Sequence, residues 1–95
     1  MKPEEKVKAE HKAFLTSIGA WWFMPVQTGY GAAGVPDFLC CVQGRMVAIE
    51  TKAPGKRPTK WQEQMIARIN SAGGCAFWTD SLDYTKQMLK AGGVV

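Results

Sequence analysis

The sequence lacks several features that would place it in common protein classes. It has no apolar run of the roughly 20 residues that a membrane-spanning helix requires. Its start, Met1-Lys2-Pro3-Glu4-Glu5-Lys6, carries acids and lacks the apolar segment of a signal peptide, so none is expected. It also has no internal repeat and no low-complexity stretch. We therefore expect residues 1–95 to form a single domain with a modest core and no membrane partner.

Cysteine is scarce, and the net charge is only mildly positive. Cys40, Cys41 and Cys75 are odd in number and lack the spacing of metal ligands. We expect reduced, buried thiols, and hence an intracellular, reducing compartment such as the cytoplasm. Lys and Arg number 12 against 8 Asp and Glu, which gives a formal charge of +4. This charge permits nucleic-acid binding without requiring it.

A glycine-rich segment at residues 29–34 is too incomplete to be a phosphate-binding loop. No Gly-Lys-Ser/Thr follows it, and the next predicted element is a strand instead of a helix. We therefore expect no nucleotide cofactor. The small residues of this segment instead allow its backbone to approach a partner closely.

Periodicity and capping signals predict an α/β protein with the order α-β-β-β-α-β-α. Pro25 removes a backbone donor, so the first strand is expected at a sheet edge or at a bulge. The strand after the second helix can return parallel to its predecessor through a right-handed crossover, which gives a mixed four-stranded sheet with helices on both faces. The predicted helices cover residues 3–17, 59–72 and 81–90, and the strands cover 21–27, 38–42, 45–51 and 75–79.

The second and third strands form a hairpin that turns at Gln43-Gly44. Opposed residues of such a hairpin have position numbers with a constant sum, so Asp37 faces Glu50 when the strands fold back at this turn. Directly opposed Cβ atoms lie about 4.5–5.5 Å apart. Lys52 is two residues after Glu50 and points to the same face. Two carboxylates so close repel each other unless a cation lies between them, and Mg²⁺ prefers such oxygen ligands.

This cluster has the parts needed to hydrolyse a phosphodiester. Asp37 and Glu50 would hold one or two divalent ions, which lower the pKa of bound water and stabilise charge on a phosphoryl oxygen. Lys52 would stabilise developing charge or orient the attacking water. The alternative is a salt-bridged hairpin in which Lys52 merely neutralises the acids. That alternative gives little reason for directly opposed acids, which destabilise a hairpin.

Two further polar residues are open to more than one interpretation. Glu10 borders the apolar face of the first helix, where it is either an edge carboxylate paired with a lysine or an inward-facing ligand or water-positioning group. Gln62 follows Thr59 by three residues and completes a capping box. On spacing alone, the cap is the preferred role for Gln62.

The motifs resemble those of the PD-(D/E)xK nuclease superfamily, and specifically its virus-type replication-repair nuclease branch, the VRR-NUC domain, in its stand-alone viral form. The resemblance rests on Gly34-Val35-Pro36-Asp37 and Glu50-Thr51-Lys52, on the proline-containing basic loop after Lys52, and on Gln62. It covers nearly the whole chain, and it implies a restriction-endonuclease-like fold.

The resemblance also implies a role for each residue of the cluster. Asp37 and Glu50 would be metal ligands, Lys52 the catalytic lysine, and Glu10 the first-helix acid that helps to organise the metal. Gln62 would be a site residue instead of a cap, since one side chain is not expected to do both. The implied cofactor is Mg²⁺ or Mn²⁺, as one or two ions.

The expected substrate is branched DNA. Lys56, Arg57 and Lys60 lie where neighbouring phosphates would pass. Residues 29–34 lack the basic side chains common in the family, so Tyr30 or backbone amides would substitute there. The implied function is a metal-dependent, structure-selective DNA endonuclease, a Holliday-junction resolvase acting as a homodimer in the host cell of a virus or phage.

The sequence is also compatible with three other functions. The first is a repair nuclease acting on flaps or other branched DNA. The second is a non-catalytic DNA-binding module that keeps the fold and the basic loop. The third is a protein-interaction domain using the aromatic strand, whose Trp21 and Trp22 are expected to be core or subunit-contact residues.

Overall fold

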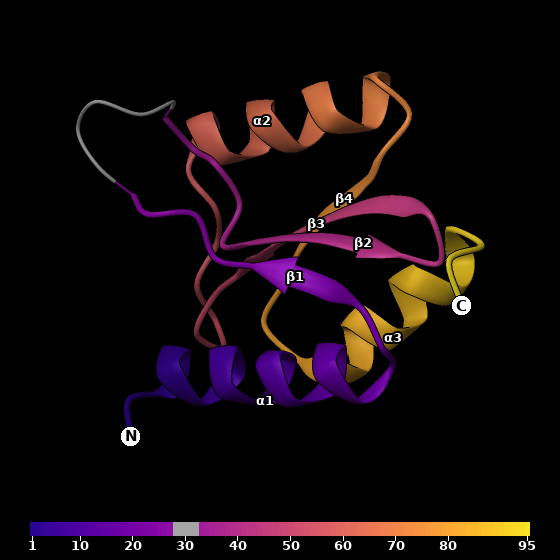
Figure 1. Ribbon diagram of the computed structural model, residues 1–95. Coiled ribbons are helices and arrows are strands. Elements are labelled where there is room, and N and C mark those ends of the chain that lie inside the picture. The colour runs from indigo at the N-terminus through magenta and orange to yellow at the C-terminus, as the bar shows by residue number, and fades with distance from the viewer. Residues whose placement is uncertain (28–32) are drawn as a thin grey trace.

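The computed structural model describes residues 1–27 and 33–95, and it has the predicted order of elements (Figure 1). Helix α2 covers one face of the sheet, while α1 and α3 lie against the other (Figure 1). None of the helices in the described ranges is both long and apolar enough to cross a membrane. The elements are α1 (Pro3–Ser17), β1 (Trp21–Phe23), β2 (Phe38–Val42), β3 (Arg45–Thr51), α2 (Lys60–Ser71), β4 (Cys75–Thr79) and α3 (Leu82–Ala91).

The four strands form one mixed sheet in the order β1-β2-β3-β4. The first three strands are antiparallel, and β4 runs parallel to β3 after the crossover through α2. The predicted α/β class and edge position of β1 are confirmed. The strand is shorter than predicted, since it ends at Phe23 instead of residue 27. Pro25 explains this difference because it cannot donate a ladder hydrogen bond.

The β2–β3 hairpin has the predicted turn and register. Gln43 and Gly44 both have positive φ, at 51° and 78°, as expected for the two-residue turn that matches the twist of paired strands. Val42 then pairs with Arg45, and pairing continues without a slip to Phe38 and Ile49. The hairpin therefore brings the residues just beyond this last pair together at its open end.

The core lies between the sheet and the α1–α3 layer. His11 is fully buried there; its Nδ1 lies 2.8 Å from the Val7 carbonyl oxygen and its Nε2 lies 2.6 Å from Thr85 Oγ1. Burial lowers the pKa of His11, which keeps the ring neutral as a packing residue. The buried apolar cluster comprises Leu15, Phe38, Cys40, Val42, Val47, Ile49, Phe77, Leu89 and Val94.

The three cysteines are free but differ in burial. Cys40 is buried, Cys75 is half-buried and Cys41 is exposed. The expectation of buried thiols is therefore wrong for Cys41, because adjacent strand residues point to opposite faces and Cys40 occupies the core side. Burial raises the pKa of the Cys40 thiol to about 12, so it remains protonated.

Candidate functional site

The open end of the β2–β3 hairpin gathers three charged side chains. Asp37 immediately precedes β2, while Glu50 lies near the end of β3. Glu50 is only 3% exposed. Lys52, just after β3, places its Nζ 3.3 Å from Glu50 Oε2. The charged cluster predicted from hairpin register is thus present as a partly buried group.

Asp37 is held through one of its two carboxylate oxygens. Thr51 donates to Asp37 Oδ2 from its backbone nitrogen at 3.1 Å and from its hydroxyl at 2.6 Å. Lys8 Nζ, from α1, lies 3.9 Å from the same oxygen. These three contacts fix the carboxylate and leave Oδ1 as the oxygen best placed to bind a ligand.

The Glu50 carboxylate is likewise held through only one of its two oxygens. Its Oε2 accepts a hydrogen bond from Gln62 Nε2 at 3.2 Å and also lies beside Lys52. Its Oε1 is buried, and among the described residues it has no hydrogen-bond partner. Burial, followed by the negative charge of Asp37, raises the pKa of the Glu50 carboxyl to about 7, against the opposing effects of Lys52 and Lys8.

This donor set fits a hard divalent cation. A buried carboxylate oxygen without a partner costs free energy that a bound cation would offset. Within residues 1–27 and 33–95, no three His, Cys, Asp or Glu side chains form a group that would enclose a metal. Mg²⁺ does not need such an enclosure, because it is usually bound by one or two carboxylates together with water and substrate phosphate. Asp37 and Glu50 are therefore suitable ligands for Mg²⁺ or Mn²⁺.

Gln62 makes both the helix cap and a contact to the cluster, which were expected to exclude each other. Its Oε1 accepts a hydrogen bond from the Thr59 backbone nitrogen at 2.8 Å, and its own backbone nitrogen donates to Thr59 Oγ1 at 3.2 Å. Its Nε2 simultaneously donates to Glu50. The expectation that one side chain could not do both is wrong, because the two ends of the amide serve different partners.

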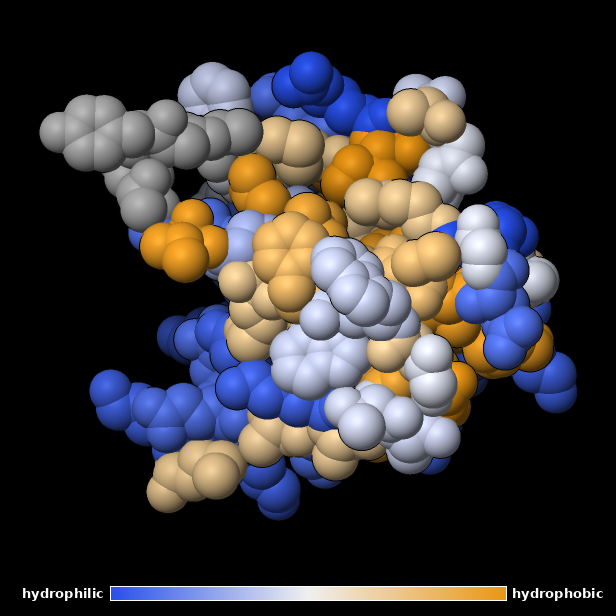
Figure 2. All heavy atoms as spheres, viewed as in Figure 1, coloured by the Kyte–Doolittle hydropathy of each residue, from blue (hydrophilic) through white to orange (hydrophobic). Residues whose placement is uncertain are grey.

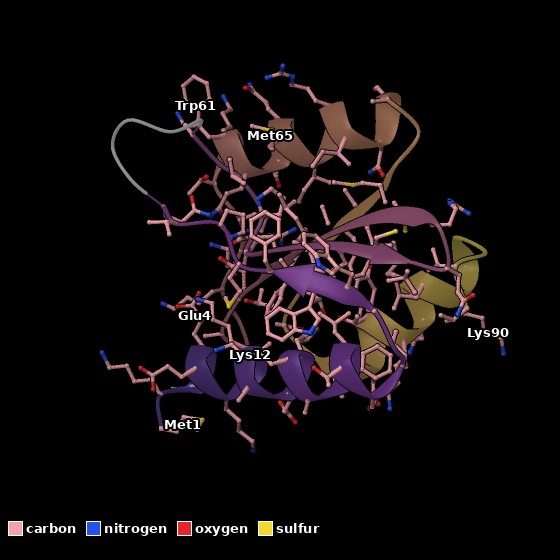
Figure 3. All side chains as sticks on the ribbon, viewed as in Figure 1. Met1, Glu4, Lys12, Trp61, Met65 and Lys90 are labelled. Atoms are coloured by element: carbon pink, nitrogen blue, oxygen red, sulfur yellow. The ribbon has the colours of Figure 1, made fainter. Side chains whose placement is uncertain are left out.

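The structure does not bring Glu10 into the cluster. The Glu10 side chain is exposed instead of bordering the apolar face, and within the described ranges it joins no group of three metal-binding side chains. Helix α1 instead reaches the cluster through Lys8, whose Nζ lies 3.6 Å from Glu4 as well as near Asp37. In Figure 3, Glu4 projects from α1 on the side that faces the sheet.

Glu4 and Lys8 were not among the residues predicted from the sequence, although a signal for Glu4 exists. Glu4 precedes His11 by seven residues, which is nearly two full turns of 3.6 residues. It therefore shares the buried stripe of Val7, His11 and Leu15, whereas Glu10 is about 100° away from His11. An acidic residue on the same side of a helix as its buried residues is therefore the sequence signal that would have identified Glu4.

The predicted DNA-contacting residues occupy an exposed rim beside the cluster. Lys56 and Arg57 lie in the loop after β3, and Lys60 begins α2; all three are exposed. Trp61 is 65% exposed and stands at the start of α2 (Figure 3). Tyr30 lies outside the described residues.

Comparisons with known proteins relate the chain to nucleases. No protein-family model matches the sequence. Over 54 residues the chain is 39% identical to the protein named "Putative nuclease p44" of Acyrthosiphon pisum secondary endosymbiont phage 1. That match covers 56% of this chain and 58% of the phage protein, which is less than two thirds of the relative's length.

A solved structure described as a VRR_NUC domain has a similar fold. The two structures align with a TM-score of 0.79 at 20% sequence identity, over 95% of this chain and 97% of the other. The chain therefore has the fold of a VRR_NUC domain. The resemblance and the restriction-endonuclease-like architecture predicted from the motifs are confirmed at the level of the fold.

Proposed function

We propose that this protein is a Mg²⁺- or Mn²⁺-dependent DNA endonuclease that cuts four-way junctions as a homodimer. The observation that carries the proposal is the Asp37–Glu50 pair, with the buried and unpartnered Oε1 of Glu50. The VRR_NUC fold and the similarity to a phage protein named as a nuclease support the same reaction class. A structural ion pair alone would leave this oxygen unexplained.

In this proposal each residue of the cluster has a defined task. Asp37 and Glu50 would hold one or two ions, and the bound ions would lower the pKa of water and neutralise charge on the phosphoryl group. Lys52 stabilises negative charge that develops on the phosphate. Thr51 orients Asp37 and Gln62 orients Glu50 through the hydrogen bonds described above, so both carboxylates are positioned before DNA binds.

The exposed rim and α1 supply contacts around the cut phosphate. Lys56, Arg57 and Lys60 bind flanking phosphates, and Tyr30 is proposed as a further DNA contact. Lys8 adds positive charge next to Asp37 and is itself held by Glu4. We omit Glu10 from the ligand set because its side chain is exposed and no described contact links it to Asp37 or Glu50.

An uncovered part of the sheet supports dimer formation. Helix α2 packs over β3 and β4, so among the described residues the same face of β1, β2 and the first residues of β3 leaves large apolar side chains exposed. Trp21 is 64% exposed, Phe23 44% and Met46 42%. Apolar and pale side chains gather across the middle of the face shown in Figure 2. A two-fold related copy would cover this patch with the same patch of its partner and present two active sites to a junction.

The proposal is tested by cleavage of DNA substrates of different shape. Labelled four-way, flap and linear DNA of matched sequence are incubated with the protein, with Mg²⁺ or with EDTA, while sedimentation gives the oligomeric state. We expect Mg²⁺-dependent cutting of the four-way substrate well above that of linear duplex, by a dimer. Faster cutting of flaps would instead indicate a repair nuclease, and binding without any cutting would indicate a non-catalytic module.

Metal binding should depend on Asp37. If the site is half-saturated at about 1 mM, 10 mM Mg²⁺ raises the free energy of unfolding by about 1.4 kcal/mol. In a domain of this size that is a rise in Tm of roughly 6–11 °C. Asp37→Asn should lose most of this rise, whereas Asp83→Asn, an exposed acid in the first turn of α3, should retain it. Calorimetric titration would detect the same difference directly, and equal Mg²⁺ responses in both variants would contradict the ligand assignment.

The two roles of Gln62 can be separated by paired substitutions. Gln62→Leu and Thr59→Ala each remove part of the capping box, so each should lower the free energy of unfolding by about 1 kcal/mol. Only Gln62→Leu also removes the hydrogen bond to Glu50, and loss of such an orienting partner lowers metal affinity or activity by about 10–100-fold. Cleavage near the wild-type rate by both variants would show that Gln62 acts as a cap alone.

A further inference from the structure

A cleft of about 240 Å³ lies at the carboxyl end of β4 and is lined by Trp78, Thr79, Asp80 and Tyr84. We propose that this cleft binds one unpaired nucleobase of the DNA, adjacent to the phosphodiester that is cut. This inference rests on the proposed function, because it names the part of the substrate that lies next to the same active site.

The parallel register of β3 and β4 places the cleft beside the catalytic cluster. Glu50 pairs with Trp78, and Thr51 pairs with Thr79, on strands about 4.8 Å apart. Side chains of paired residues project to the same face, so Trp78 flanks Glu50. The backbone nitrogen of Lys52 donates to the Thr79 carbonyl oxygen at 2.9 Å. A DNA strand with a phosphate at Lys52 would therefore run next to the end of β4, where the cleft lies.

The turn after β4, which carries Asp80 of the cleft, is already ordered by hydrogen bonds. Thr79 Oγ1 donates to the Ser81 carbonyl oxygen at 2.6 Å and accepts from the Ser81 backbone nitrogen at 3.1 Å. Ser81 Oγ in turn accepts a hydrogen bond from the Tyr84 backbone nitrogen at 3.2 Å. Asp80 is fixed between these bonded residues, so little further ordering is needed when a ligand enters.

The side chains that line the cleft favour a nucleobase over a phosphate. The half-buried Trp78 and the 44% exposed Tyr84 offer aromatic surfaces on which any base can stack. Within the described ranges, no Lys or Arg lies within 4 Å of the Asp80 carboxylate, so its charge repels a phosphate. The same carboxylate accepts hydrogen bonds from the exocyclic amino group of a base, as in contacts to cytosine N4.

The size of the cleft indicates a single base that is not paired. Its volume is below the roughly 300–1,000 Å³ of sites for drug-sized ligands, and a base pair would not fit. Because thymine carries carbonyl oxygens where cytosine and adenine carry an amino group, the cleft should disfavour thymine.

The experiment uses a four-way junction with one unpaired nucleotide next to the mapped cut. That nucleotide is cytosine, thymine, an abasic site or the fluorescent base 2-aminopurine. Binding is measured in EDTA and cleavage in Mg²⁺. We expect 2-aminopurine to be quenched by the wild type. We also expect Tyr84→Leu to weaken binding of the cytosine substrate about 10-fold with no effect on the abasic one, while Tyr84→Phe binds as the wild type does.

Base preference is tested separately through Asp80. The wild type should favour cytosine over thymine, Asp80→Asn should lose this preference, and Asp83→Asn, outside the cleft, should keep it. If the wild type cuts no DNA at all, the proposed function fails and this inference fails with it. If the wild type cuts junctions but Tyr84→Leu leaves binding of all the substrates unchanged, only the base-binding cleft is overturned.

Discussion

Replacing Lys52 with alanine is expected to lower the rate of DNA cleavage by about 10²–10³-fold, the usual loss when one preorganised group that stabilises transition-state charge is removed. The affinity for DNA should change little. Lys52 is only 15% exposed in its side chain and is directed to Glu50, so it contributes little to the exposed basic rim. Its effect should therefore appear in kcat and kcat/KM together, as for an interaction made only in the transition state.

Lys56→Ala is the matched control for Lys52→Ala. Lys56 is exposed in the loop after β3, where it is proposed to contact a flanking phosphate. Its loss should weaken binding, reduce the slope of log affinity against log salt by about 1, and leave kcat near the wild-type value. Single-turnover cleavage and fluorescence anisotropy separate these effects. Cleavage by Lys52→Ala at the wild-type rate would remove Lys52 from the catalytic group.

Much of the fold followed from local signals in the sequence. The Gln43-Gly44 turn set the register of the hairpin, and alternation along β2 put Cys40 and Cys41 on opposite faces, although both thiols were expected to be buried. Thr59 and Ser81 marked the beginnings of α2 and α3 as N-caps. These features are predictable because each depends on residues only a few positions apart, whose geometry is the same in most proteins.

The errors at the candidate site concern contacts between elements that are distant in the chain, whereas the early end of β1 and the exposure of Cys41 have local causes. The dual role of Gln62 requires the first turn of α2 to lie against the end of β3, which spacing from Thr59 does not reveal. Glu10 was assigned from its position beside an apolar stripe, but the orientation of α1 over the sheet brings Lys8 and Glu4 to the site instead. Tertiary packing decides which edge of an amphipathic helix faces a site.

Gly34→Ala is the substitution expected to cost the most stability. Gly34 has φ of +76°, a conformation that costs a residue with a side chain about 1–2 kcal/mol. A Cβ there would also lie 2.5 Å from both the carbonyl carbon and oxygen of Trp61 and 2.8 Å from the Gln62 backbone nitrogen. These are backbone atoms in the first turn of α2, so the helix or the loop must move, at a further cost of about 1–3 kcal/mol.

Gly44→Ala provides the comparison that isolates this close approach. Gly44 has a similar φ of +78°, but a Cβ there would meet no atom within 4 Å. Urea unfolding should therefore show only the backbone cost for Gly44→Ala, and about 1–3 kcal/mol more for Gly34→Ala. The activity should differ as well. Movement of α2 shifts Gln62 away from Glu50, so folded Gly34→Ala should cleave DNA slowly while Gly44→Ala cleaves normally. Equal losses of stability would mean that contact between the Gly34 loop and α2 does not help to hold the active site together.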